Sequence, residues 1–219
     1  MHPFYEVFVS SLIEADKEAC VSSVLDQMDN NRLDIPTLYM EILAPALNHH
    51  FCQSEQELLC IWEEHIRSSI IRTIIECCYP YVIRERDQKL GGARKGRVVV
   101  VCPTQELHEL GARMVADFFT LAGFDTAFVG ANTPQDEIIE GIGRYQPDYV
   151  CISVTASFNL VAARRTMQHI LDVRSRWGSD FKVVVGGHAF YRNPELAREL
   201  GADLHVTSLE QIHQLGEKA

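Results

Sequence analysis

The sequence contains no long hydrophobic run and no excess of positive charge. None of its 219 residues belong to an apolar stretch approaching the ~20 residues that cross a membrane, and the amino terminus lacks the pattern of a signal peptide. The formal net charge is −10, and both halves of the chain are acidic. Acidic surfaces disfavour phosphate contacts. We therefore expect no membrane partner and no direct binding to nucleic acid.

The cysteines do not form a disulfide framework. Their count is odd and they are scattered, which is more typical of reduced thiols in the cytoplasm than of a secreted scaffold. The seven positions are Cys20, Cys52, Cys60, Cys77, Cys78, Cys102 and Cys151. A hydrophobic content of 47% with 23% charged residues is ordinary for a soluble globular protein, so we expect a folded chain in the cytoplasm.

The first part of the chain has no convincing strand pattern. Apolar residues recur at helical spacing in four segments, which predicts a four-helix bundle over residues 1–84. Asp34 and Pro36 indicate the start of the third segment, and Pro45 should kink it. Ser54 and Glu57 have the spacing of a capping box at the start of the fourth. Residues 85–96 are polar and contain glycine, which is typical of a linker.

After the linker the pattern changes to short buried strands separated by helices. Five such units over residues 97–219 predict a parallel, doubly wound, Rossmann-like sheet. The expected strands are Val98–Val101, Thr126–Val129, Tyr149–Val154, Lys182–Val185 and Leu204–Val206. The fold class is therefore a helical bundle followed by an α/β sheet.

Polar residues and glycines follow the first, third and fourth expected strands, where ligands bind in such sheets. The first strand is followed by Glu106-x-His108-x-x-Gly111, and no dinucleotide or Walker motif occurs. The third is followed by Ser153-x-Thr155 and the fourth by Gly186-Gly187. Each group has an ordinary structural interpretation: a solvated histidine, a strand end, a glycine turn. Their occurrence together at neighbouring strands favours a binding site.

This combination resembles the cobalamin-binding domain of methionine synthase, corrinoid methyl carriers and light-sensing B12 regulators. That family has Asp-x-His-x-x-Gly, then Ser-x-Leu or Ser-x-Thr, then Gly-Gly. Many members also carry a helix bundle in which a Pro-Ala-Leu segment precedes a Trp and a Glu-His pair. Here Pro45-Ala-Leu47 precedes Glu64-His65, so the resemblance covers nearly the whole chain.

The resemblance implies cobalamin bound in the base-off, His-on form, with His108 as the lower ligand of cobalt. Neutral imidazole suits first-row transition metals. Glu106 would accept a hydrogen bond from the other ring nitrogen. Gly111, Gly186 and Gly187 would let the cofactor tail approach the backbone, and Ser153 and Thr155 would bind it. Glu106 in place of the usual Asp matches some light-sensing members and leaves the geometry of its contact with His108 open.

The upper face of the cofactor departs from the family pattern. Ser54 stands where relatives often have the Trp that covers an adenosyl group, and Trp62 is better explained as a core or interface aromatic. We therefore expect water, hydroxide or methyl as the upper ligand in preference to adenosyl. Glu64 and His65 stand where the helical cap meets the corrin in relatives, although an exposed helix face explains them equally well.

Three classes of function compete. The resemblance favours a regulatory sensor rather than an enzyme, similar to the AerR and PpaA antirepressors, which bind cobalamin and act on a repressor of the CrtJ or PpsR type. A corrinoid methyl carrier is the alternative, although carriers normally keep Asp before the histidine. The small subunit of a mutase usually lacks a helical half. Haem is a minor alternative cofactor, since His108 could also bind iron. Oligomeric state and a response to light stay open.

Overall fold

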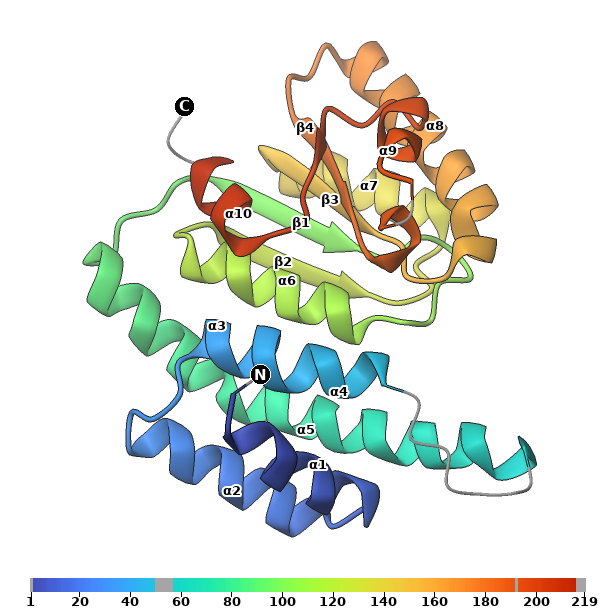
Figure 1. Ribbon diagram of the computed structural model, residues 1–219. Helices are drawn as coiled ribbons and strands as arrows, with labels where there is room; N and C mark the ends of the chain where they lie inside the picture. The colour runs from blue at the N-terminus through green and yellow to red at the C-terminus, as the bar shows by residue number, and fades with distance from the viewer. Residues whose placement is uncertain (1, 50–56, 192, 216–219) are drawn as a thin grey trace. The chain divides into compact units, whose positions relative to one another are not determined.

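A computed structural model describes residues 2–49, 57–191 and 193–215. The chain divides into two compact units, Met1–Lys89 and Leu90–Ala219. The first unit is helical and the second contains a parallel sheet (Figure 1). Both features confirm the predicted fold class.

The helical unit consists, in its described residues, of four helical segments. They are α1 (Phe4–Ile13), α2 (Lys17–Asp29), a composite of α3 (Ile35–Thr37), a π-helix (Leu38–Leu43) and α4 (Ala44–Asn48), and the long α5 (Glu57–Leu90). Each segment contributes fully buried apolar side chains, among them Phe8, Met28, Leu38, Tyr39 and Ile75. Their burial supplies the main stabilisation of the unit, since short isolated helices are marginal in water.

The third segment begins and bends where its sequence indicates. Asp34 caps it, because its Oδ1 accepts the Thr37 N–H at 2.8 Å. Pro45 lies in the first turn of α4, directly after the π-helix. Proline has no N–H and its ring clashes with the carbonyl four residues earlier, so a regular α-helix cannot continue through it. The expected irregularity therefore takes the form of a π-helical turn, in which the Ala44 N–H bonds to the Tyr39 carbonyl.

The predicted linker over residues 85–96 is wrong for residues 85–90, because α5 continues to Leu90. Contacts made by side chains in this stretch hold it in the helix. Arg86 is buried, and Glu85 Oε1 accepts the Ile35 N–H at 2.8 Å. The chain leaves the helix at Gly91 and Gly92, whose positive φ angles of 56° and 85° favour glycine.

The sheet unit contains five described strands, all parallel, in the order β2-β1-β3-β4-β5. Continuous β-branched runs form the central strands because these strands are covered on both faces. The strands are β1 (Arg97–Val101), β2 (Asp125–Gly130), β3 (Tyr149–Ser153), β4 (Lys182–Gly186) and β5 (Leu204–His205). All five predicted strands are confirmed.

Helices cover the sheet on both faces (Figure 1). Alternate strand residues, including Val99, Ile152 and Val185, form a core with α7 (Gln135–Tyr145), α8 (Leu160–Trp177) and α9 (Glu195–Glu199). On the opposite face α6 (Leu110–Leu121) packs on β1 and β2 and contacts α10 (Leu209–Leu215). This two-sided covering leaves the strand ends as the accessible edges of the sheet.

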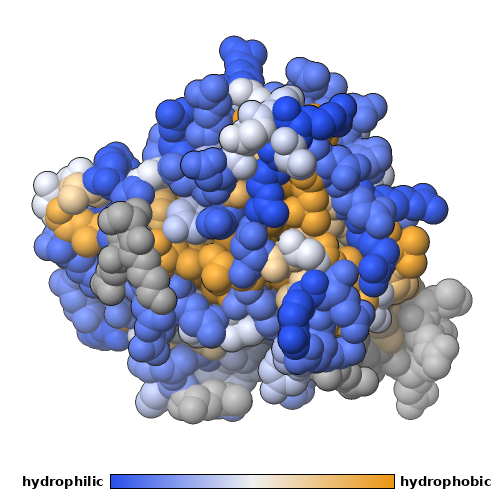
Figure 2. All heavy atoms as spheres, turned by 90° about the horizontal axis from the view of Figure 1, so that it is seen from above, coloured by the Kyte–Doolittle hydropathy of each residue, from blue (hydrophilic) through white to orange (hydrophobic). Residues whose placement is uncertain are grey.

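No helix among the described residues is long and apolar enough to cross a membrane. The face shown in Figure 2 is mostly hydrophilic, with apolar side chains visible between the polar ones. The thiols of Cys20, Cys77, Cys78, Cys102 and Cys151 are not in disulfides, whereas Cys60 is. The sequence favours reduced thiols over a disulfide framework, and among these described cysteines Cys60 is the exception.

Candidate functional site

The three sequence motifs meet at the carboxyl edge of the sheet. They follow β1, β3 and β4, which are neighbours. The register pairs Val101 with Ile152 and Ser153 with Gly186, so the three loops leave the sheet side by side. The chain direction across the sheet reverses between β1 and β3, and such a switch point is where open α/β sheets bind ligands.

Glu106 is the centre of this edge. Its side chain is fully buried, and its two carboxylate oxygens accept four hydrogen bonds. Oε1 accepts the His108 N–H at 2.9 Å and His108 Nδ1 at 2.6 Å. Oε2 accepts the N–H groups of Thr155 at 2.9 Å and Ala156 at 3.0 Å. One carboxylate therefore joins the loop after β1 to the loop after β3.

The hydrogen bonds keep this buried carboxylate charged. Burial by itself would raise the pKa of Glu106, but the N–H donors of His108 and Ala156, together with the side chains of Asn159 and His108, outweigh it and lower the pKa. An ionised carboxylate only accepts hydrogen bonds. The proton of the neutral His108 ring must therefore lie on Nδ1.

His108 then presents the lone pair of Nε2. The imidazole is about half exposed, with 51% of its side-chain surface accessible. A carboxylate on one ring nitrogen fixes the tautomer and makes the other nitrogen a better metal ligand. The extra methylene of Glu relative to Asp is compatible with this contact, which answers the question that the sequence left open.

The loop after β1 is held in shape by the loop after β2. Gln105 has a positive φ of 74°, and its N–H donates to Asn132 Oδ1 at 2.9 Å. The Asn132 N–H donates to the Glu106 carbonyl at 2.9 Å. Thr104 Oγ1 donates to the Thr133 carbonyl at 3.0 Å. These bonds restrict the backbone on both sides of Glu106 and so preorganise the pair that it forms with His108.

The three predicted glycines at this edge have two different roles. Gly187 has a φ of 108°, and a Cβ atom on it would lie 2.3 Å from the Val154 carbonyl oxygen. A Cβ on Gly186 would lie 3.0 Å from the Val206 carbonyl oxygen. Gly111, in the first turn of α6, has open space where its Cβ would be. The first two are required by the packing of the loops, whereas Gly111 leaves a surface that a ligand can approach.

The two hydroxyl residues occupy different positions. Ser153 is buried at the end of β3. Thr155 is the donor to Glu106 through its N–H, and its Oγ1 donates to the His108 carbonyl at 3.5 Å. Thr155 therefore stabilises the histidine loop directly, a role that its place at a strand end does not reveal.

The predicted contacts above the cofactor lie in the helical unit. Ser54 falls outside the described residues. Glu64 and His65 are both exposed, and His65 lines a cavity of about 380 Å³ together with Trp62 and Lys17. His65 Nδ1 lies 2.7 Å from the Ile61 carbonyl oxygen, to which it donates. Trp62 thus lines the same cavity as His65, and Glu64 is not among the residues that line it.

Two asparagines and a backbone amide at the site were not predicted. Asn132 shapes the histidine loop, and the Ala156 N–H binds Glu106. Asn159 is buried at the start of α8. In the sequence, an asparagine before a helical pattern indicates only a cap, and a backbone amide carries no signal of its side-chain partner.

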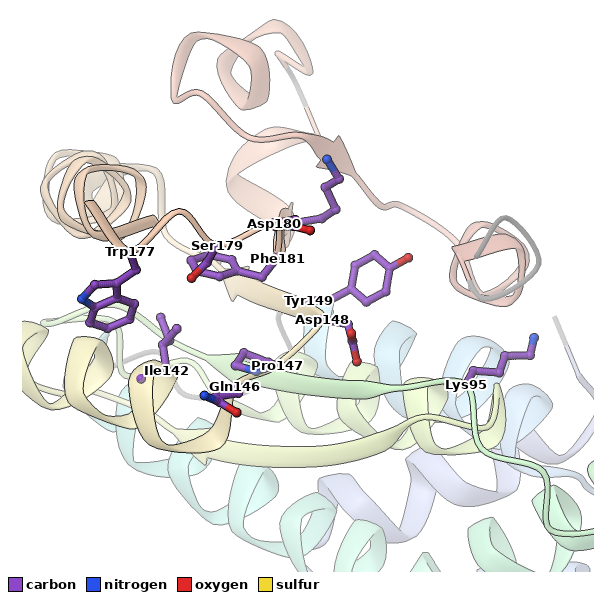
Figure 3. Close-up of a pocket in the computed structure, with 12 residues that line it drawn as sticks. Lys95, Ile142, Gln146, Pro147, Asp148, Tyr149, Trp177, Ser179, Asp180 and Phe181 are labelled. Atoms are coloured by element: carbon purple, nitrogen blue, oxygen red, sulfur yellow. The ribbon is translucent and has the colours of Figure 1, made fainter. Parts of the chain in front are cut away.

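A cavity at the opposite edge of the sheet does not belong to this site. Figure 3 shows it at the amino ends of β3 and β4, with a volume of about 880 Å³. Its polar groups hold the fold together. Asp148 Oδ2 accepts the Arg97 N–H at 2.7 Å, Tyr149 Oη donates to the Leu215 carbonyl, and Lys95 Nζ donates to the His213 carbonyl. None of the residues predicted for the site lines it.

The donor set at the carboxyl edge fits a metal that brings its own ring of ligands. Among the described residues no group of three or more His, Cys, Asp or Glu side chains could hold a bare ion. A single imidazole fixed by a carboxylate suits a metal held in a macrocycle, as a proximal histidine does. The exposed apolar side chains of Leu107, Phe158 and Tyr191 in the same three loops suit a broad, partly apolar ligand.

Comparison with known proteins agrees with this geometry. The B12 binding domain model matches residues 96–210. The chain is 26% identical over 211 residues to the HTH-type transcriptional repressor CarH of Myxococcus xanthus, covering 95% of this chain and 66% of that protein. The chain therefore spans slightly less than two thirds of the length of this relative.

One solved structure shows the same fold over nearly the whole chain. The monomethylamine corrinoid protein of Methanosarcina barkeri superposes with a TM-score of 0.77 at 12% identity, covering 98% of this chain and 97% of that one. The methanol:cobalamin methyltransferase complex MtaBC, also from Methanosarcina barkeri, gives a TM-score of 0.49 at 13% identity, with coverages of 96% and 77%. The family match covers more than half of the chain and all five strands, and the chain therefore belongs to the B12-binding domain family as a cobalamin-binding protein.

Proposed function

We propose that this protein is a cobalamin-dependent regulatory sensor that acts through a protein partner. The observation that carries the proposal is the similarity to a transcriptional repressor, which extends over 95% of the chain and so includes both units. The partner we propose is a transcriptional repressor of the CrtJ or PpsR type, which the protein would antagonise as AerR and PpaA do.

The charge of the chain supports a protein partner. The formal net charge is −10, and both units are acidic. Proteins that bind DNA gain affinity from lysine and arginine contacts with phosphates. A chain with this negative charge is poorly suited to such phosphate contacts. We therefore propose that an effect on transcription passes through another protein.

His108 is the residue we propose as the lower ligand of cobalt, in a base-off, His-on complex. Cobalamin supplies a cobalt ion whose axial ligation can change. Nε2 of His108 offers the lone pair, and Glu106 holds Nδ1 at 2.6 Å. Gly111, Gly186 and Gly187 form the part of the edge that the tail approaches, and Ser153 and Thr155 offer hydroxyl groups to it.

An absorption spectrum tests the ligand assignment. Apoprotein is mixed with hydroxocobalamin and, separately, with haem, and each sample is freed of unbound ligand. We expect corrin bands in the first sample and expect His108→Ala to remove the spectral change that histidine ligation produces. If haem is retained with a Soret band and cobalamin is not retained, haem would be the cofactor instead of cobalamin. An unchanged spectrum in His108→Ala would remove His108 as the ligand.

Binding to a repressor tests the regulatory part. The purified cobalamin complex is titrated against a purified repressor of the CrtJ or PpsR type, and repressor binding to its operator is measured in parallel. We expect direct association and loss of operator binding. Absence of both effects in the cobalamin-bound and cobalamin-free forms would contradict the antirepressor role while leaving the cofactor site intact.

A corrinoid methyl carrier is the second candidate, because the chain has the fold of a corrinoid protein at a TM-score of 0.77 over nearly its full length. The methylated holoprotein would then lose its methyl group to a partner methyltransferase with an acceptor thiol. Transfer at a rate that depends on His108, without any repressor binding, would favour the carrier.

The upper face is proposed to take a small ligand. Ser54 offers little apolar surface for an adenosyl group, and Glu64 and His65 are proposed to face the corrin from the helical unit. Affinities measured in the dark should therefore rank hydroxocobalamin and methylcobalamin above adenosylcobalamin. Tighter binding of adenosylcobalamin would contradict this ranking.

A further inference from the structure

The first part of α5 carries apolar residues that the helical unit does not bury. They recur at intervals of three or four residues and therefore lie on one side of the helix, and they are Leu59, Trp62, Ile66 and Ile70. Ile70 is buried and Ile66 is half-buried, whereas Trp62 is 68% exposed and Leu59 is 47% exposed. The apolar side of α5 that packs in the bundle therefore continues into solvent.

A cavity lies beside this exposed part, at the turn between α1 and α2. Its volume is about 380 Å³. Trp62 and Ile66 line it from α5, and Ala15 and Lys17 line it from the turn, beyond which α5 extends (Figure 1). Tryptophan is enriched among the residues that dominate protein interfaces, where it pairs with apolar side chains seated in pockets. The cavity and the exposed indole together suit an apolar side chain of a partner protein.

The turn between α1 and α2 is fixed by its own hydrogen bonds. Ala15 has a positive φ of 55°, and its N–H donates to the Leu12 carbonyl at 3.1 Å. The Asp16 N–H donates to the Ser11 carbonyl at 3.0 Å, and Asp16 Oδ1 accepts the Ala19 N–H at 2.9 Å. This wall of the cavity is therefore already formed, and a partner does not have to order it.

The charges of the turn favour a basic partner. The turn has the sequence Glu14-Ala-Asp16-Lys17-Glu18, and its three carboxylates and its one ammonium group are all exposed. Carboxylates around an apolar cavity are complementary to an apolar side chain that is surrounded by lysine and arginine. The same carboxylates repel nucleic acid. Charge and shape therefore fit a basic protein surface with an apolar anchor.

We propose that Leu59, Trp62, Ile66 and residues 14–18 form a docking surface that binds the basic, DNA-binding surface of the partner repressor. A repressor surface that contacts phosphates must carry lysine and arginine. Docking and DNA binding then exclude one another, which gives the expected loss of operator binding a physical cause. The inference rests on the proposed function, which makes a repressor the partner.

Affinity for the repressor tests the docking surface. The cobalamin-bound protein is titrated by calorimetry against a purified repressor of the CrtJ or PpsR type. Trp62→Ala removes one wall of the cavity, so affinity should fall about 30-fold, as at an interface hot spot. Trp177→Ala truncates an exposed tryptophan of the sheet unit and is the matched control, which should bind as the wild type does. Thermal unfolding checks that each variant is folded.

A charge reversal tests the carboxylates of the turn. Glu14→Lys combined with Glu18→Lys should lower affinity about tenfold, mostly through slower association. Glu137→Lys combined with Glu140→Lys makes the same change of net charge on exposed positions of α7 and should leave affinity close to that of the wild type. Equal losses in the two double variants would mean that overall charge attracts the repressor, and the role of the turn would be wrong.

Labelled operator DNA shows which surface of the repressor is occupied. The wild-type protein should displace the operator from the repressor, and no complex of all three components should form. Trp62→Ala should need about 30 times the concentration for the same displacement. A stable complex of protein, repressor and operator would overturn the assignment of the DNA-binding surface.

Failure of the proposed function gives a different result from failure of the docking surface. If the wild type does not bind the repressor, the proposed function is wrong and this inference is wrong with it. If the wild type binds and Trp62→Ala binds equally well, the function stands and only the docking surface is wrong. Trp62→Ala should also keep the wild-type affinity for hydroxocobalamin. A loss of that affinity would assign the indole to the cofactor, and a dimer of the protein alone that Trp62→Ala abolishes would assign this surface to a second copy. Either result overturns the proposal.

Discussion

The two edges of the sheet use polar side chains in different ways. At the carboxyl edge, Glu106 joins two loops and leaves Nε2 of His108 available to a ligand. At the amino edge there is a cavity of about 880 Å³, yet Asp148, Tyr149 and Lys95 are all bonded to backbone atoms that fix strand and helix ends. The edge with the cavity is structural, and the edge with the histidine is equipped for chemistry.

This difference shows that volume alone does not locate a site. A hollow forms wherever loops of unequal length diverge, and it requires no functional group. A buried charged group held by four hydrogen bonds is costly unless its partners are in place. Such an arrangement at a topological switch point is better evidence of a binding site than empty space is.

The largest effect should come from Glu106→Ala, which removes the group that joins the two loops. Loss of the partner of a metal-binding histidine typically weakens binding about 10–100-fold. Four donors also lose their acceptor, so the free energy of unfolding of the apoprotein should fall by about 3 kcal/mol. Titration with hydroxocobalamin and chemical denaturation measure the two quantities. The exposed Glu137→Ala in the same unit is the control, and equal values in both variants would contradict the role of Glu106.

Two glycine variants should separate packing from cofactor approach. Gly187→Ala places a methyl group 2.3 Å from the Val154 carbonyl at a φ of 108°, so it should cost about 2–3 kcal/mol of stability as well as affinity. Gly111→Ala fills open space in a helix, so it should leave the apoprotein as stable or more stable.

The informative quantity is the affinity of Gly111→Ala for hydroxocobalamin. If the cofactor approaches α6 at this point, affinity should fall about tenfold while the melting temperature does not. Affinity equal to that of the wild type would mean that the open surface at Gly111 is not part of the site.

The strands and the grouping of the motifs were predictable from the sequence. Central parallel strands are covered on both faces, so they appear as continuous β-branched runs such as Val98–Val101. Once the topology is known, the residues after β1, β3 and β4 must share one edge. Glu106, His108 and Gly187 were predicted as site residues by this reasoning together with the family resemblance.

The hydrogen bonds that complete the site were not predictable. The Thr155 and Ala156 donors are backbone groups, whose direction depends on the fold of the loop. Asn159 has the sequence signal of a helix cap, but its side chain makes no capping bond. The predicted end of α5 was also wrong because it depends on contacts that the local sequence does not reveal. Contacts distant in sequence, such as Glu85 with Ile35, extend a helix through a polar stretch.

A smaller effect, confined to stability, is expected at the amino edge for Asp148→Ala. Asp148 Oδ2 accepts the Arg97 N–H, and it fills the place that a Cβ atom on Gly96 would take. Removing it should lower the free energy of unfolding by about 1–2 kcal/mol. The affinity for hydroxocobalamin should not change. A tenfold loss of affinity in a variant that stays folded would mean that the two edges are coupled, and the contrast between them would fail.

The smallest effect is expected for Trp177→Ala, which tests the cavity itself. Trp177 is 48% exposed and packs over Gly143, where a Cβ atom would lie 3.0 Å from the indole ring. Truncation widens the cavity but removes little buried surface, so stability should fall by about 1 kcal/mol or less. Affinity for hydroxocobalamin, measured by calorimetry, should equal that of the wild type. An indole so exposed is a natural stacking surface, and reduced affinity here would give the amino edge a direct part in cofactor binding. If Trp177→Ala keeps the affinity of the wild type and Glu106→Ala loses affinity, the cofactor binds at the carboxyl edge. That edge contains the buried carboxylate of Glu106.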